Sequence, residues 1–220
     1  MPSVNTVLSI LDKPFLKPWA IKGSVNEAIR LMNNNTADTD RIFREAALWS
    51  ENYRTYAANV GTEAHKIIEN WIRSGRSNYQ DGVNIANSIA NAEVRQAFVA
   101  FLKWALDREP KYIASEIMGE SRMGYAGTCD AICDIEGVRY LVDFKTSTRL
   151  NDTYAIQVAA YRHMFNEHGY AIDQSALLRL DKKTGKYQWQ AISDAEDRVL
   201  FARFECLLKY WVLTFGDRRR

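Results

Sequence analysis

The chain has 220 residues, a hydrophobic share of 47% and a charged share of 25%, which is the composition of a folded globular protein. These values exclude a disordered, collagen-like or coiled-coil protein. The formal net charge of +2 excludes a strongly basic chain, so any nucleic-acid surface must be a local patch.

Cysteine content and hydropathy indicate the cellular compartment in which the protein is expected. Three cysteines, an odd number in a chain of ordinary length, argue against a disulfide framework and for a reducing compartment. The sequence contains no apolar stretch of about 18 residues, and its first residues lack the charged start and apolar core of a signal peptide. We therefore expect a cytoplasmic protein without a membrane segment.

Helical spacing of apolar residues dominates the first 110 or so residues. The predicted helical segments are Thr6–Leu11, Pro18–Met32, Ile42–Tyr53, Gly61–Gly75 and Ala90–Leu106. Asp38 or Thr39 is the expected N-cap of the third segment. Gly61 is expected to begin a new helix, and the polar residues between Gly75 and Ala90 are expected to form a loop.

The hydrophobic period changes after Pro110, where strands are expected. The predicted strands are Lys111–Met118, Tyr125–Ile135, Val138–Lys145, Ala176–Leu180 and Tyr187–Ile192. Glu136 and Gly137 predict a hairpin, and Asn151 or Asp152 and Ser193 or Asp194 are the expected caps of two helices. The order β-β-β-α-β-β-α over 111–220, after a helical part over 1–110, predicts one α/β domain over 1–220. Its small mixed sheet has helices on both faces.

Charged residues end the third predicted strand. Asp143 and Lys145 share one face of it, because side chains alternate along a strand. Taken alone, such a pair is also typical of an exposed strand end with a surface ion pair. Asp130 changes this interpretation, because a hairpin at Gly137 would bring it close to Asp143. Neighbouring carboxylates repel each other unless a cation lies between them, and oxygen ligands favour Mg²⁺ or Mn²⁺.

Further residues make this pattern more specific. Gly127-Thr128-Cys129-Asp130 is followed by Asp143-Phe144-Lys145-Thr146, and the two aspartates are thirteen residues apart. A helix with Gln157 and Tyr161 one turn apart comes next, and His65 lies on an upstream helix. Together these motifs resemble the PD-(D/E)XK nuclease superfamily. Within it they resemble the RecB-type exonuclease branch, which includes the CRISPR-adaptation exonucleases and the mitochondrial genome maintenance exonuclease.

The resemblance implies a restriction-endonuclease-like core and a divalent-metal-dependent DNA exonuclease. Its implied substrate is DNA, as single strands or duplex ends, in recombination, repair or phage DNA metabolism. The alternatives are a structure-specific endonuclease of this fold and a non-cleaving DNA-binding module. A recombinase or single-strand-binding protein is the implied protein partner, and a phage-encoded chain would act in the host cytoplasm. The iron–sulfur cluster of some relatives is not expected, because it needs four cysteines.

The resemblance also implies a role for individual residues. The implied metal ligands are His65, Asp130, Asp143 and the backbone carbonyl of Phe144. Lys145 would orient or deprotonate the attacking water and stabilise charge in the transition state. Gln157 and Tyr161 would support this lysine and contact the DNA. Glu116 is either a further metal-binding acid or an ordinary strand charge, and His65, read from the residues alone, is also typical of a core histidine.

Polar residues follow the strand that carries the candidate lysine. Thr146, Ser147 and Arg149 come directly after Lys145. Hydroxyl groups and an arginine at a strand end suit contacts with phosphate, so we expect DNA binding here. The alternative is an ordinary polar loop.

Overall fold

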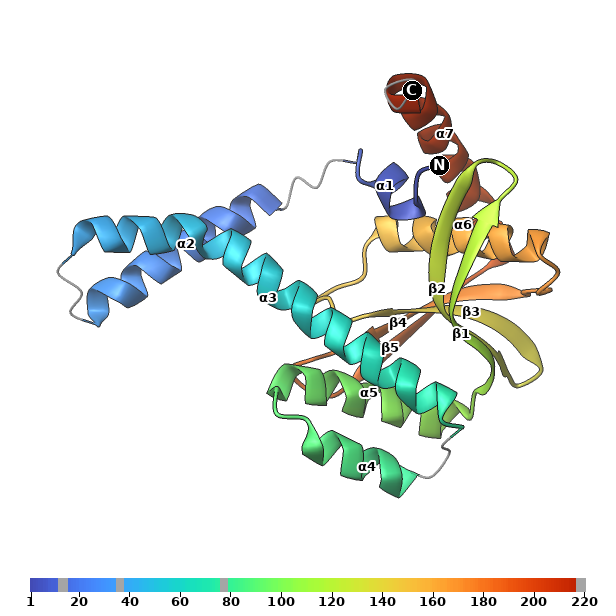
Figure 1. The fold of residues 1–220 in the computed structure, drawn as a ribbon, viewed down its shortest axis with the longest axis horizontal. Coiled ribbons are helices and arrows are strands. Elements are labelled where there is room, and N and C mark those ends of the chain that lie inside the picture. Colours follow the sequence, from blue (N-terminus) through green and yellow to red (C-terminus); the bar gives the residue numbers. More distant parts are fainter. Residues whose placement is uncertain (12–15, 35–37, 76–78, 217–220) are drawn as a thin grey trace. The chain divides into compact units, whose positions relative to one another are not determined.

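The computed structural model describes residues 1–11, 16–34, 38–75 and 79–216 (Figure 1). The helices are α1 (Val4–Leu8), α2 (Leu16–Asn33), α3 (Thr39–Arg73), α4 (Tyr79–Ser88), α5 (Ala92–Arg108), α6 (Asp152–Glu167) and α7 (Asp194–Phe215). The strands are β1 (Lys111–Ser121), β2 (Tyr125–Ile135), β3 (Val138–Lys145), β4 (Gln174–Leu180) and β5 (Tyr187–Ile192). The chain forms two compact units, one of Asp12–Thr62 and one of Met1–Leu11 with Glu63–Arg220.

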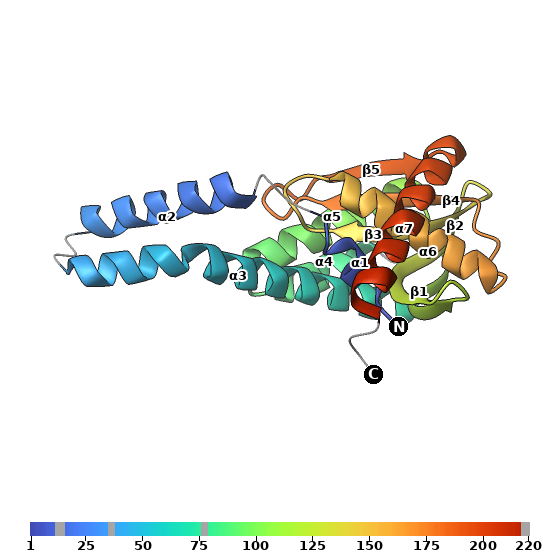
Figure 2. The ribbon, with the colours of Figure 1, turned by 90° about the horizontal axis from the view of Figure 1, so that it is seen from above.

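The unit of residues 12–62 is a pair of helices. In it α2 and the first part of α3 lie side by side (Figure 1, Figure 2). Trp19 of α2 contacts Trp49 and Tyr53 of α3, with ring centroids 5.0 and 5.5 Å apart. This aromatic cluster holds the two helices together, since such ring pairs add about 0.5–1.5 kcal/mol each beyond their buried area.

The larger unit is mixed α/β, with a five-stranded sheet in the order β1-β2-β3-β4-β5. The neighbouring strands are antiparallel except for β3 and β4, which run parallel. A parallel connection needs a crossover, and α6 provides it. The predicted mixed sheet flanked by helices is confirmed, and the elements over 111–220 follow the predicted order.

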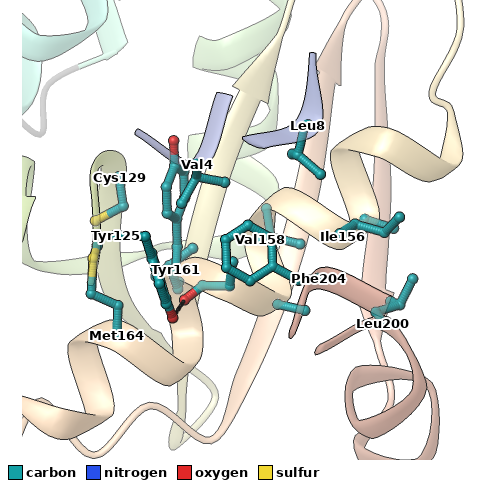
Figure 3. Close-up of a cluster of buried hydrophobic side chains, with 14 of the residues drawn as sticks. Val4, Leu8, Tyr125, Cys129, Ile156, Val158, Tyr161, Met164, Leu200 and Phe204 are labelled. Carbon is teal, nitrogen blue, oxygen red and sulfur yellow. Dashed lines mark hydrogen bonds between the residues drawn. The ribbon is translucent and has the colours of Figure 1, made fainter. Parts of the chain in front are cut away.

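The main hydrophobic core lies where α1, α6 and α7 pack against the sheet (Figure 3). Val4 and Leu8 of α1 and Phe204 of α7 enter this cluster, and Phe204 meets Tyr125 edge to face with centroids 4.7 Å apart. Strand β3 also contacts α5, since the Phe144 ring packs edge to face on Phe101 with centroids 5.6 Å apart. Helix α5 therefore belongs to the same unit as the sheet.

The N-terminal residues add to the sheet. Ala126 N–H of β2 donates to the carbonyl of Pro2 at 3.0 Å, and Ser3 forms a parallel bridge with Ala126. Val4, Val7 and Leu8 are at most 2% exposed, so α1 is anchored by its apolar face as well as by its backbone.

Two helical predictions are wrong. Gly61 does not begin a helix: α3 continues through it, although glycine costs roughly 1 kcal/mol inside a helix. The predicted loop between Gly75 and Ala90 contains α4, whose small residues Gly82 and Ala86 are buried. A Cβ at Gly82 would lie 2.6 Å from the Leu102 side chain of α5. Although most residues of α4 are polar, the helix therefore packs closely on α5 at its small residues.

The turn and cap predictions are confirmed where the structure tests them. Glu136 and Gly137 have φ angles of 52° and 83°, the backbone of a two-residue hairpin whose twist matches that of the strands. Asn151 caps α6, and Ser193 caps α7 with a reciprocal bond to Glu196. In the described part of the chain, no helix is both long and apolar enough to cross a membrane.

We predict that Leu208→Ala lowers the free energy of unfolding by about 2–5 kcal/mol, because it empties a site in the core cluster. Leu213 of the same helix is 78% exposed, and Leu213→Ala is expected to cost less than about 0.5 kcal/mol. Urea titration of both variants measures the difference, and equal losses would contradict the packing of α7.

Candidate active site

Two buried aspartates lie on neighbouring strands, Asp130 in the middle of β2 and Asp143 near the end of β3. Ala131 of β2 pairs with Val142 of β3, and Asp130 and Asp143 are the next residues along the two strands. They are 8% and 2% exposed, respectively. Asp130 Oδ2 accepts the Phe144 backbone N–H at 2.6 Å, which fixes this carboxylate at the end of β3. The hairpin therefore brings the two predicted aspartates together.

His65 and Glu116 reach the same place from other elements. His65 lies on α3 within the larger unit, and its Nδ1 is 3.3 Å from Asp130 Oδ1. Glu116 lies inside β1 with a φ of 49°, a left-handed conformation that costs an ordinary residue about 1–2 kcal/mol. Such strain within a strand is common where a side chain is aimed at a functional site.

The geometry identifies one possible metal-binding group among the described residues. One ligand atom each from His65, Glu116 and Asp130 lies within 4.8 Å of the others. One imidazole nitrogen with two carboxylate oxygens is a donor set that suits a divalent ion such as Mn²⁺. Glu116, which the sequence left open, thus belongs to this group, whereas Asp143 does not satisfy the same distance limit.

Asp143 lies instead against the candidate catalytic lysine. Lys145 Nζ is 2.6 Å from Asp143 Oδ2, so a close ion pair joins the lysine to the buried carboxylate. The ammonium group donates to Gln157 Oε1 at 2.9 Å and lies 4.7 Å from the centre of the Tyr154 ring. Lys145 is therefore held by a carboxylate, an amide oxygen and an aromatic face.

Gln157 and Tyr161 form a small buried network on α6. Gln157 Nε2 donates to Tyr161 Oη at 3.1 Å and to Asn5 Oδ1 of α1 at 3.1 Å. The Tyr161 ring lies over Gly127 of β2, where a Cβ would come within 2.4 Å of the ring. The glycine of the Gly-Thr-x-Asp motif thus makes room for the tyrosine that supports Gln157.

The electrostatics of the site reflect crowded negative charge. Burial and repulsion by Asp130 raise the pKa of Glu116 to about 7. Burial disfavours the imidazolium of His65, but the carboxylate of Asp130 outweighs burial and raises the pKa of His65 to about 9. Burial raises the pKa of Asp143, whereas His65 lowers that of Asp130 against the effect of burial. The site thus holds protons that a divalent cation would replace.

The charge of Lys145 is also set by its neighbours. Burial works against the ammonium form, but the carboxylates of Asp143 and Asp130 outweigh burial and raise the pKa of Lys145. Lys145 is therefore a fixed cation here, which suits it to orient groups and offset negative charge.

Three of the predicted DNA-contacting residues lie in the loop after β3, whereas the other two, Gln157 and Tyr161, are buried on α6. Thr146 and Ser147 are half-buried and Arg149 is exposed, so the loop lies next to Lys145 and is open to solvent. Ser147 Oγ donates to the Arg149 carbonyl, and Arg179 of β4 donates to the Thr148 carbonyl. These hydrogen bonds hold the loop in its conformation. That its residues contact DNA stays a prediction. Metal binding by the Phe144 carbonyl also stays a prediction.

Two residues of the site were not predicted. Tyr154 has a signal in the sequence, because it lies one turn before Gln157 and so shares its helix face. Asn5 has none: it is 152 positions from Gln157, and no local pattern links them.

A scan against protein-family models and a search of the curated proteins both find no match to this chain. The geometry of the site must therefore carry the functional argument.

We predict that Glu116→Gln and Asp130→Asn each weaken Mn²⁺ binding at least about tenfold, because each removes a charged oxygen from the group around His65. Isothermal titration of the protein with Mn²⁺ measures the affinity. Glu120→Gln, an exposed position on the same strand as Glu116, is the control and should bind as the wild type does. Wild-type Mn²⁺ affinity in Glu116→Gln would show that Glu116 is not a ligand of the ion.

Proposed function

We propose that this protein is a divalent-metal-dependent DNA exonuclease with a PD-(D/E)XK core of the RecB-type branch. The observation that carries the proposal is the convergence of two groups where Asp130 of β2 lies beside Asp143 of β3. One is the possible cation site of His65, Glu116 and Asp130, and the other is Lys145 held between Asp143 and Gln157.

Each of these residues has a separate proposed role in phosphodiester hydrolysis. His65, Glu116 and Asp130 would hold the cation, and Asp143, which lies beside Asp130 on the neighbouring strand, is proposed as a further ligand. A divalent cation bound there would supply activation of water and positive charge beside the scissile phosphate. Lys145 supplies a positive charge at a fixed position, where negative charge develops on the phosphate oxygens. Gln157 keeps the lysine in that position.

The resemblance of the motifs favours an exonuclease over an endonuclease. The upstream His65 and the Gln157–Tyr161 pair on α6 are the features shared with the exonuclease branch. Two supports for the proposal follow from their geometry: His65 contacts Asp130, and Gln157 contacts both Lys145 and Tyr161. Each residue of the motif set has a partner that its proposed role requires.

We predict that Lys145→Ala and Asp143→Asn reduce DNA cleavage about 100-fold or more, because each removes a charge that acts on the reacting phosphate or its cation. Both variants should keep the wild-type circular dichroism spectrum. Lys66→Ala, an exposed lysine next to His65, is the control and should cleave normally. An Asp143→Asn protein that digests DNA at the wild-type rate would contradict the assignment.

The mode of attack is tested with two single-stranded substrates, one linear and end-labelled and one a closed circle. With Mg²⁺ or Mn²⁺ we expect loss of the linear strand, survival of the circle and complete inhibition by EDTA. Cutting of the circle would establish the endonuclease alternative. DNA binding without any cleavage in either metal would establish the non-cleaving module and overturn the catalytic role of Lys145.

A further inference from the structure

We propose that Asn5 of α1 is a positioning residue that holds the Gln157 amide in the orientation needed by Lys145. The inference rests on the proposed nuclease function for its catalytic consequence, but the contact itself does not depend on that function. It means that the first residues of the chain complete the active site.

The hydrogen bonds of the Gln157 side chain account for the proposal. Gln157 is 6% exposed, and its carbonyl oxygen accepts from the Lys145 ammonium at 2.9 Å. Its amide group has two N–H hydrogens, and the structure gives two acceptors for them, Tyr161 Oη and Asn5 Oδ1, each at 3.1 Å. All polar groups of this amide are therefore satisfied in one orientation.

The opposite orientation of the amide would turn its NH₂ group toward the ammonium of Lys145, which can only donate. Lys145 therefore already favours the orientation that presents oxygen to it. Tyr161 adds little to this preference, because a hydroxyl donates as readily as it accepts. Asn5 Oδ1 accepts the second N–H on the far side of the amide and so holds the amide in that orientation.

The segment that carries Asn5 is anchored without it. Val4, Val7 and Leu8 are buried in the core, and the Pro2 carbonyl accepts from β2. Figure 3 shows Val4 of α1 beside Tyr161 of α6. The side chain of Asn5 is on the exposed side of α1, so it can be replaced without emptying the core.

The kinetic test compares three substitutions of Asn5 with Ser9→Ala, an exposed position just after α1. Asn5→Leu and Asn5→Ala remove the acceptor, and we expect kcat for DNA cleavage to fall about tenfold with KM unchanged. Asn5→Asp keeps a carboxylate oxygen as acceptor and should restore kcat to within about threefold of the wild type. Wild-type kcat in Asn5→Leu, or an Asn5→Asp protein as slow as Asn5→Leu, would overturn the proposal.

A second readout needs no catalysis. In a ¹⁵N–¹H spectrum the two side-chain N–H signals of Gln157, assigned by their loss in Gln157→Ala, should be slow to exchange with water in the wild type. In Asn5→Leu one of them should shift and exchange faster, while Ser9→Ala leaves both in place. Unchanged Gln157 signals would overturn the proposal even if the wild type cleaves DNA. A wild type that does not cleave, with the signals shifting as expected, would overturn the nuclease function and not the contact.

Discussion

The repulsion between Asp130 and Asp143 is the constraint around which the rest of the site is arranged. Both carboxylates are buried, and the hairpin register places them at neighbouring positions. Burial of one unpaired carboxylate is already costly, and burial of two side by side is tolerated only with compensating charge. In this protein that charge comes from His65 and Lys145, and the Phe144 N–H adds a hydrogen bond to Asp130.

The residues around the two aspartates come from several elements, so the site exists only in the complete larger unit. Helix α3 brings His65, strand β1 brings Glu116 through a strained backbone, and α6 brings Gln157. The strained backbone at Glu116 places a third carboxylate in a site that is already acidic, which is unfavourable by itself. A bound cation would offset this repulsion and so would account for the strain. A purely structural acidic cluster would gain nothing from that arrangement.

The sequence predicted contacts that depend on local patterns better than it predicted contacts between residues far apart in the chain. Alternation in β3 and a two-residue turn at Glu136–Gly137 were enough to bring Asp130 near Asp143, because both are local signals. The continuity of α3 through Gly61 was not predictable from propensity, because glycine is a poor helix former.

The contacts that complete the site could not be predicted from sequence patterns. The place of Glu116 depended on a left-handed backbone inside a strand, for which an ordinary glutamate gives no signal. The contact between Asn5 and Gln157 joins the first helix to the sixth. Only the folded chain brings these residues together, so the motifs did not predict the full set of residues around the site.

The most direct test of the central claim is to locate bound Mn²⁺ by anomalous X-ray scattering from crystals of the wild-type protein grown with the ion. The account predicts a peak within ligand distance of His65, Glu116 and Asp130, and its loss from crystals of Asp130→Asn grown in the same way. A wild-type site without a peak, at an Mn²⁺ concentration that supports binding in solution, would contradict the assignment of these buried charges to a metal centre.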